Sequence, residues 1–263
     1  MSFRKFAALT TLACSLSATA HSAVLIHDYQ LNNSLADAIG GPSLVSNGGT
    51  LGATSYSFAA NQGLTLTNGF ANNANYSVEM QFSFTETSGY RKILDFKNLT
   101  SDNGLYNFST NLSFYPVQTG SGAKITAGTI VNVILTRDGT TNFVTGYVNG
   151  GQEFTFNDSG SLGVFSSAGS VAQFFQDDTA ISQREASAGL VDFIRVYDGA
   201  VTTVEASCLN STKPDRSPAG CAIFGGVTNQ DVPEPGSLAL LGAGLVILVA
   251  RRGRRASSGP AAT

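Results

Sequence analysis

Carboxylates and histidines are the side chains of this sequence that could serve as acids, bases or metal ligands. Glycoside hydrolysis uses two carboxylates about 5 to 10 Å apart. Glu79 lies in an alternating segment, but Gln81 and Ser83 hold the next positions of the same face. The two histidines, His21 and His27, accompany neither a Gly-x-Ser-x-Gly turn nor a His-Glu-x-x-His pair. We therefore expect no catalytic residue and a solvent-facing Glu79, while a glycosidase or lyase that uses Glu79 is the enzyme alternative.

Four aspartates define a second candidate, a calcium site. Asp177 and Asp178 are adjacent in the sequence, and Asp37 or Asp102 could complete a group of ligands. Calcium prefers hard oxygen ligands carried by loops. Adjacent aspartates before a strand are also typical of a solvated turn, so we expect no cofactor and retain calcium as the alternative.

The N-terminus has the three parts of a secretory signal. Residues 1–5 are basic, residues 6–16 are apolar or small, and Ala18-Thr19-Ala20 offers the small residues that a signal peptidase recognises. We expect residues 1–20 to be removed and the rest to be exported through the Sec machinery. A buried N-terminal helix is the alternative, but no downstream segment has a helical period with which it could pack.

Two cysteines, Cys208 and Cys221, remain once Cys14 has left with the signal peptide. An even number of cysteines in an exported chain indicates a disulfide. In the entropic description, a bond that closes a loop of this size stabilises the fold by about 3 kcal/mol. We expect this bond within a tail and linker at residues 207–231.

The C-terminus combines a Pro-Glu-Pro, an uncharged run and an arginine cluster. Pro233 and Pro235 favour extended backbone around Glu234. As a membrane helix, residues 236–250 would reach about 22 Å, less than the roughly 30 Å hydrocarbon core of a bilayer. Basic clusters stay on the cytoplasmic side and so orient the body outward. The cluster consists of Arg251, Arg252, Arg254 and Arg255.

This arrangement resembles the PEP-CTERM sorting signal of Gram-negative bacteria over residues 232–255. The resemblance implies that an exosortase in the inner membrane recognises Pro233, Glu234 and Pro235, and that the tail is removed after export. It also implies a species that makes extracellular polysaccharide. Residues 256–263 extend beyond the point where the family often stops, and we expect them to form a short cytoplasmic tail. An ordinary membrane anchor is the alternative.

Composition and charge narrow the class of the body. Charged residues make up 13% of the chain, tryptophan is absent and glycine occurs 29 times in 263 residues, a balance typical of turn-rich β structure. A net charge of −3 argues against a nucleic-acid partner, which would require a basic surface. Six of the 15 basic residues lie in the two ends, so the body between them is acidic.

Period-two alternation predicts strands throughout this body. Residues 76–84 alternate without a break, which predicts a half-buried strand. Its apolar face carries Tyr76, Val78, Met80, Phe82 and Phe84. Asn149-Gly150 predicts a hairpin turn between strands at residues 143–148 and 152–156. Further strands are expected at residues 64–67, 92–96, 105–108, 112–115 and 130–137.

The strand expected at residues 190–197 is apolar on both faces. Val191, Phe193 and Tyr197 are predicted to face one way, and Ile194 and Val196 the other. A strand of this kind lies inside a sandwich. Its two charged residues, Asp192 and Arg195, must then be paired or lie at its edges.

Four segments are similar, in order, to landmarks of the laminin G-like, concanavalin A-like jelly roll. They are residues 28–37, 76–84, 131–139 with 146–150, and 189–197. Thr129-Ile130 replaces the tryptophan that usually precedes the family's central strand. The resemblance implies an all-β antiparallel sandwich over residues 21–206 that binds glycans or proteins, sometimes with calcium at the rim of a sheet.

These observations favour an exported, non-catalytic protein of the cell envelope, cell surface or extracellular matrix. It would bind a glycan or a surface partner after transient anchoring in the inner membrane. Tyr90 and Tyr106 are candidate exposed aromatics for stacking on sugar rings, although aromatic residues in strands more often belong to the core. A structural matrix protein without a specific ligand is the second hypothesis.

Overall fold

The computed structural model describes residues 23–166, 168–211 and 221. The chain divides into two units, residues 1–226 and 227–263, and every described residue belongs to the first. Within the described part, no helix has the length and hydropathy that a membrane span requires. The signal peptide expected at residues 1–20 and the membrane segment expected at residues 236–250 lie outside the described residues.

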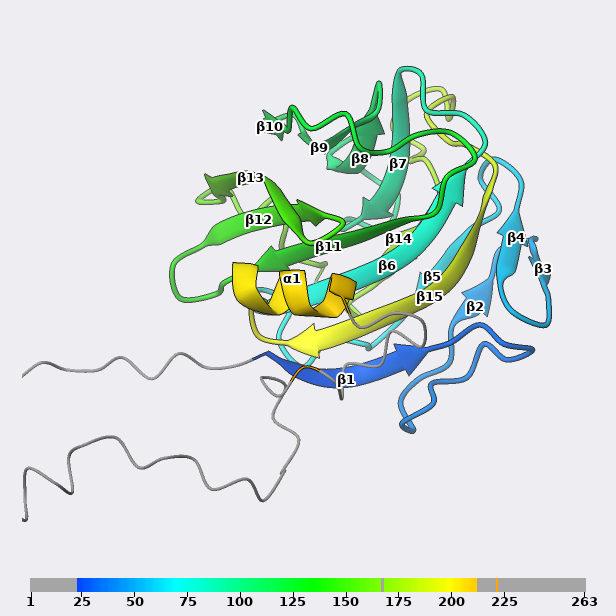
Figure 1. Ribbon diagram of the computed structural model, residues 1–263, viewed down its shortest axis with the longest axis horizontal. Helices are drawn as coiled ribbons and strands as arrows, with labels where there is room; N and C mark the ends of the chain where they lie inside the picture. The colour runs from blue at the N-terminus through cyan, green and yellow to red at the C-terminus, as the bar shows by residue number, and fades with distance from the viewer. Residues whose placement is uncertain (1–22, 167, 212–220, 222–263) are drawn as a thin grey trace, which may run out of the picture. The chain divides into compact units, whose positions relative to one another are not determined.

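Two antiparallel sheets, which we name sheet A and sheet B, contain all the strands of the described chain (Figure 1). Sheet A has eight strands in the order β13 (Gly151–Asn157), β12 (Phe143–Val148), β11 (Val131–Arg137), β6 (Tyr76–Phe84), β15 (Gly189–Asp198), β4 (Tyr56–Phe58) and β3 (Thr50–Leu51), with β1 (Val24–Tyr29) also paired to β15. Sheet B has seven, in the order β10 (Gln118–Thr119), β9 (Asn111–Tyr115), β8 (Gly104–Phe108), β7 (Tyr90–Asp95), β14 (Ala172–Phe174), β5 (Leu64–Leu66) and β2 (Val45–Ser46).

The two sheets pack face to face around one apolar core. The chain moves from β4 in sheet A to β5 in sheet B, back to β6, and across again to β7. All five apolar residues predicted for one face of β6 lie in this core, from Tyr76 to Phe84. Phe175 packs against Phe58 and Phe82, with ring centroids 4.8 and 5.1 Å apart. Burial of each such side chain contributes about 1.5 to 3 kcal/mol, and the predicted β-sandwich is confirmed.

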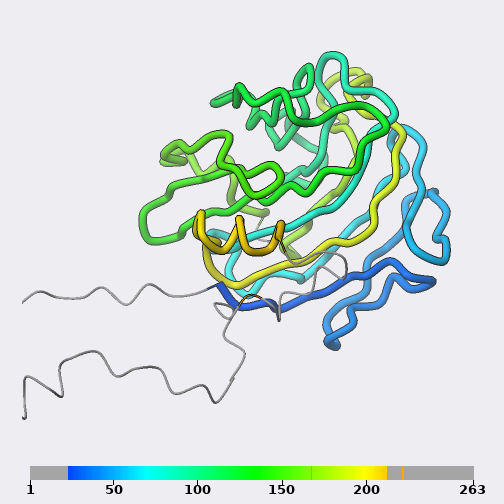
Figure 2. The backbone as a smooth tube through the Cα atoms, in the orientation of Figure 1, coloured from blue at the N-terminus to red at the C-terminus, as the bar shows by residue number. Residues whose placement is uncertain are grey.

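The opposite face of β6 is buried as well, so the prediction of a half-buried strand is wrong. Ser77, Glu79 and Gln81 are at most 4% exposed. A second apolar cluster covers this outer face of sheet A, and helix α1 (Thr203–Ser211) supplies part of it (Figure 2). Its members include Ala23, Tyr147, Tyr197, Val201, Ala206, Leu209 and Cys221.

A β-bulge in β15 changes which residues share a face. The register against β6 shifts between Val191 and Phe193. Val191 therefore joins Ile194 and Val196 in the core between the sheets, whereas the sequence alternation had placed it with Phe193 and Tyr197. A bulge inserts one extra residue and reverses the alternation beyond it. The expected pairing of Arg195 is confirmed, since its Nε lies 2.9 Å from Oδ1 of Asp28.

The tail expected at residues 207–231 begins inside α1 instead of after the domain. Cys208, on that helix, forms the predicted disulfide with Cys221, and their Cα atoms are 5.9 Å apart. Cys221 is 3% exposed and packs in the second apolar cluster. The bond therefore ties the chain after α1 to the outer face of sheet A, where it adds to an existing apolar layer.

Candidate functional site

Half-buried aromatic side chains gather on the outer face of sheet B. Ile93 and Leu105 point into the core, so the alternation of β7 and β8 turns Tyr90 and Phe108 outward. These two residues are paired across the strands. Tyr115 of β9 lies beside them, and we call Tyr90, Phe108 and Tyr115 the aromatic patch. The described sequence thus places three rings on adjacent strands β7, β8 and β9 (Figure 1).

The rings of the aromatic patch support one another. Tyr90 and Phe108 are stacked, with centroids 4.2 Å apart and planes 24° apart. Tyr115 meets Tyr90 edge to face at 5.4 Å. Offset and edge-to-face contacts are the favoured arrangements of aromatic rings. The patch is therefore a pre-formed apolar surface that is open to solvent on one side.

Tyr106 lies beside the patch on the same face of sheet B. It is buried, so the expectation of an exposed Tyr106 is wrong. Its ring meets Tyr90 edge to face at 5.5 Å. Its hydroxyl donates to the backbone carbonyl of Asp102 at 2.9 Å and lies 3.2 Å from that residue's Oδ1. Burial, and then the negative charges of Asp102 and Asp178, raise the pKa of Tyr106. The phenol therefore stays protonated and fixes the loop that carries Asp102.

Two partly exposed carboxylates, Asp102 and Glu185, lie close enough to Tyr90 of the patch to act on its hydroxyl. The backbone carbonyl of Glu185 accepts the N–H of Lys92 at 2.7 Å, which holds the loop after β14 along the edge of β7. Burial, followed by the charge of Asp178, raises the pKa of Asp102. Burial, followed by the charge of Asp102, raises the pKa of Glu185. Burial makes the largest contribution to the raised pKa of Tyr90, and Tyr115 the next largest. Both carboxylates raise this pKa further, so they act on the patch electrostatically.

A buried amine lies beneath the same loops. Lys92 Nζ is 2.7 Å from Oδ2 of Asp178 and 3.5 Å from Oδ2 of Asp95, and all three side chains are fully buried. The Nζ also lies 4.9 Å from the centroid of the Tyr106 ring. We call Lys92, Asp95 and Asp178 the lysine triad. It joins β7 to the loop that follows β14.

The aspartates considered for calcium have other partners. Asp177 and Asp178 are both fully buried instead of forming a solvated turn. Asp102 does lie near Asp178, as the calcium hypothesis required, but the ammonium of Lys92 lies against Asp178. Asp37 is engaged near β1, where it accepts from His27 and from three backbone N–H groups. Within the described ranges, no three His, Cys, Asp or Glu side chains are arranged to hold a metal ion.

Glu79, the residue of the enzyme alternative, is buried on the outer face of sheet A, so its expected solvent-facing position is wrong. It accepts from Asn132 Nδ2 at 2.8 Å and from the Tyr197 hydroxyl at 2.6 Å. Arg195 Nη1 lies 3.6 Å from its Oε2. The second apolar cluster covers this side of the sheet, and the Glu79 side chain has no exposed surface. Glu79 has the surroundings of a structural residue.

Sequence alternation held a usable signal for part of the site. Residues 90–92 have an aromatic-x-polar spacing, and residues 106–108 have an aromatic-x-aromatic spacing. In each segment the first and third residues share a face, and these are the outward positions of two paired strands. The carboxylate of Glu185 had no such signal, and the alternation did not show that Lys92 is buried, because both features depend on a loop from elsewhere in the chain. The sorting residues Pro233, Glu234, Pro235 and Arg251 to Arg255 lie outside the described residues.

The fold of this chain is similar to the folds of several solved structures. The chain is similar to domain 4 of AbnA, an extracellular arabinanase from Geobacillus stearothermophilus solved with arabinotriose, at TM-score 0.52 and 18% identity over 71% of this chain and 98% of that one. It is similar to Trypanosoma rangeli sialidase at TM-score 0.55 and 14% identity, over 73% of this chain and 34% of the sialidase. It is also similar to the binding domain of botulinum neurotoxin serotype D, at TM-score 0.51 and 11% identity, over 72% of this chain and 52% of that one.

The chain thus spans about a third of the sialidase and half of the toxin domain. No curated protein matches it in sequence. The two antiparallel sheets and these likenesses define the class of the protein as a β-sandwich of the jelly-roll type. Residues 231–255 match the PEP-CTERM protein-sorting motif. This β-sandwich protein therefore carries a signal that implies export, transient membrane anchoring and processing by an exosortase.

Proposed function

We propose that the exported body is a non-catalytic module that binds a glycan through the aromatic patch of sheet B. The observation that supports this most directly is the meeting of three half-buried rings with two partly exposed carboxylates on one face. Binding sites for small polar ligands combine an apolar surface with a few placed polar groups. A sugar ring offers the complementary chemistry, since its C–H face is apolar and its hydroxyls are hydrogen-bond donors.

In this proposal each group has a distinct part. Tyr90 and Phe108 supply the stacking surface, and Tyr115 limits how far a ring can slide along it. Asp102 and Glu185 accept hydrogen bonds from sugar hydroxyls, and bonds to a charged acceptor are stronger than neutral ones. The patch needs no general acid or nucleophile, which fits a role in adhesion and not in turnover.

Sorting and binding fit one biological role. The motif at residues 231–255 implies delivery by an exosortase, and we propose that the final location is the cell surface or the surrounding polysaccharide matrix. There the patch would hold the protein on matrix glycans. A structural matrix protein without a specific ligand remains the second proposal, supported by the compact disulfide-tied body.

We further propose that binding does not require calcium. Lys92 already neutralises Asp178, the carboxylate that was the best candidate for a metal ligand. A cation would have to displace the Lys92 side chain from this fully buried carboxylate. Equal affinity with calcium and with a chelator is the expected result.

The test is a binding measurement on the purified exported protein. An array of neutral and acidic oligosaccharides that includes arabinotriose should identify a ligand, and Tyr90→Ala should weaken it. Loss of one stacking ring is worth about 0.5 to 1.5 kcal/mol, so Kd should rise about twofold to twelvefold. Calorimetry or fluorescence titration measures the change.

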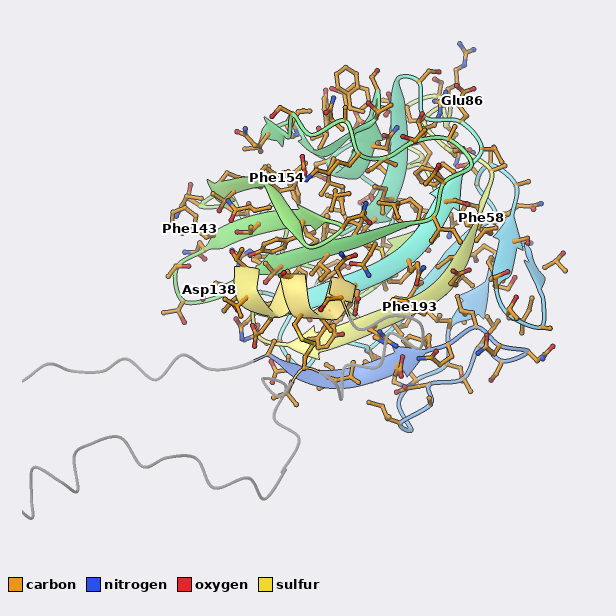
Figure 3. The ribbon with its side chains drawn as sticks, viewed as in Figure 1. Phe58, Glu86, Asp138, Phe143, Phe154 and Phe193 are labelled. Atoms are coloured by element: carbon orange, nitrogen blue, oxygen red, sulfur yellow. A yellow bond between two sulfur atoms is a disulfide. The ribbon has the colours of Figure 1, made fainter. Side chains whose placement is uncertain are left out.

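Phe143→Ala is the matched control. Phe143 is another exposed aromatic residue, 46% exposed on β12 of sheet A, and it lies at the far side of the molecule from Glu86, which precedes β7 (Figure 3). Its loss should leave the affinity unchanged. Equal weakening by both variants would contradict glycan binding at the aromatic patch. An array on which no oligosaccharide binds would favour the structural matrix protein.

A further inference from the structure

The lysine triad places an amine against a carboxylate in an enclosed site. Lys92 Nζ and Asp178 Oδ2 are 2.7 Å apart, and neither side chain has any exposed surface. We propose that Lys92 and Asp178 condense in the folded protein to form an intramolecular amide, an isopeptide bond, with Asp95 as the proton carrier. This bond would be a covalent modification that is independent of the glycan proposal.

Burial supplies the driving force that an exposed ion pair lacks. Two charges in an apolar site lose several kcal/mol of hydration each, whereas an amide is neutral. The ring of Tyr106 lies over the amine, with its centroid 4.9 Å from Lys92 Nζ. The loops that cover Tyr106 also exclude water, which keeps the product amide from hydrolysis.

Asp178 becomes an electrophile once Asp95 has carried a proton from Lys92 to Oδ2. Before that, burial opposes the charge of Asp178, but the hydrogen bond and the charge of Lys92, together with backbone hydrogen bonds, outweigh it and lower the pKa of Asp178. Its Oδ1 accepts the backbone N–H groups of Ala180 at 2.9 Å and Ile181 at 3.2 Å. These donors remain in place when Nζ attacks Cγ, so they stabilise the negative charge that develops on Oδ1. Oδ2 points at the amine and is the oxygen that leaves.

Asp95 is held as the proton carrier. Its Oδ1 accepts the backbone N–H groups of Lys97 at 3.0 Å and Leu99 at 2.8 Å. Its Oδ2 is buried without a hydrogen-bond partner and lies 3.5 Å from Lys92 Nζ. Burial raises the pKa of Asp95, so this carboxyl can take up a proton from the amine and return it. A buried polar atom without a hydrogen bond is costly. In this proposal, Oδ2 of Asp95 receives the proton that Lys92 loses.

The step balances without a further reactant. The ammonium of Lys92 carries three protons, and Asp95 relays two of them to Oδ2 of Asp178. The bond from Nζ to Cγ forms as the bond from Cγ to Oδ2 breaks. One water molecule leaves, the third proton stays on the amide nitrogen, and Asp95 returns to its starting state.

The experiment is a tryptic map of the folded wild-type protein as it is exported. Trypsin cannot cleave after an acylated lysine, so residues 92–97 should remain joined to residues 138–184, which contain Asp178 and no internal Lys or Arg. The joined species should have the summed mass of the two peptides less one water. Fragmentation should locate the bond at Lys92 and Asp178.

Three variants sharpen the result. Asp178→Ala should abolish the joined peptide and restore cleavage after Lys92. Asp95→Asn keeps the amine and the carboxylate but removes the proton carrier, so the joined fraction should fall at least tenfold. Asp178→Asn should give the same joined peptide as wild type, with ammonia as the leaving group. Complete cleavage after Lys92 in the folded wild type, with an unmodified peptide 138–184, would overturn the proposal without recourse to any variant.

Discussion

Single residues on the outer face of sheet A show how burial changes the role of a charge. Glu79 is enclosed with Arg195 and Tyr197, and each of its oxygens accepts at least one hydrogen bond. Burial opposes the charge of Arg195, but the carboxylates of Glu79 and Asp28 outweigh it and raise the pKa of the guanidinium. Burial, and then Glu79, raise the pKa of Tyr197. The network is therefore a buried, charged layer in which both oxygens of Glu79 accept hydrogen bonds.

Glu79→Gln separates a structural role from a catalytic one. Loss of one partner from a buried charge pair costs about 3 kcal/mol, the low end of the usual range because Asp28 still contacts Arg195. Urea unfolding should show this loss of stability, while glycan binding at the aromatic patch should not change.

Glu86→Gln is the control for charge alone, because Glu86 is 55% exposed in its pair with Arg91. Exposed pairs contribute little, so stability should be nearly unchanged. An unaltered unfolding curve for Glu79→Gln, or a polysaccharide-cleaving activity that this variant abolishes, would contradict the structural role.

Among the elements, α1 shows a local signal that sequence analysis left unused. Thr202 Oγ1 accepts the N–H of Glu205 at 3.3 Å, and Glu205 Oε2 accepts the N–H of Thr202 at 2.7 Å. This reciprocal arrangement is a capping box, and Thr202-Thr203-Val204-Glu205 has its sequence pattern. Leu209 then packs in the second apolar cluster. A helix start was therefore readable at residues 202–205, just before the tail and linker predicted at residues 207–231.

Thr202→Ala should destabilise the outer layer of sheet A. Loss of an N-cap typically costs about 1 kcal/mol, which urea unfolding would measure. Ser207→Ala is the matched change, since Ser207 is exposed in the middle of the same helix and alanine is the better helix former there. If both substitutions lowered stability equally, the capping interpretation of Thr202 would be wrong.

At the scale of the whole molecule, the folded body and the sorting signal have separate tasks. The body comprises the sheets, α1 and the disulfide, and all of them lie within residues 1–226. The matched motif lies at residues 231–255. Processing at the motif can therefore change the location of the protein without changing the fold that carries the aromatic patch.

Glu234→Ala should block processing by the exosortase. The Pro-Glu-Pro is the recognition element that the motif implies, so the variant should stay with the membrane fraction and retain the C-terminal arginines. Intact mass and fractionation of the native host measure both effects. Asp231→Asn, which changes a nearby acid outside the Pro-Glu-Pro, should be processed like wild type; normal release of Glu234→Ala would show that this glutamate is not recognised.

Local sequence patterns were sufficient for much of the architecture. The strand predicted at residues 76–84 coincides with β6, and the hairpin turn at Asn149-Gly150 has the positive φ values of 49° and 80° that this turn needs. The disulfide and the sorting motif were also recognisable. Short strands such as β3 and β10 were missed because two residues are too few to show a period.

By itself the sequence determined the sandwich, the Cys208–Cys221 bond and the sorting signal, because period, turn chemistry and motif are properties of neighbouring residues. Only the tertiary structure decided that Glu79 is enclosed, that Val191 faces the core, and that Lys92 meets Asp178 across 86 residues. Alternation tells which residues share a face of a strand. It does not tell what covers that face, because the covering segment comes from a distant part of the chain.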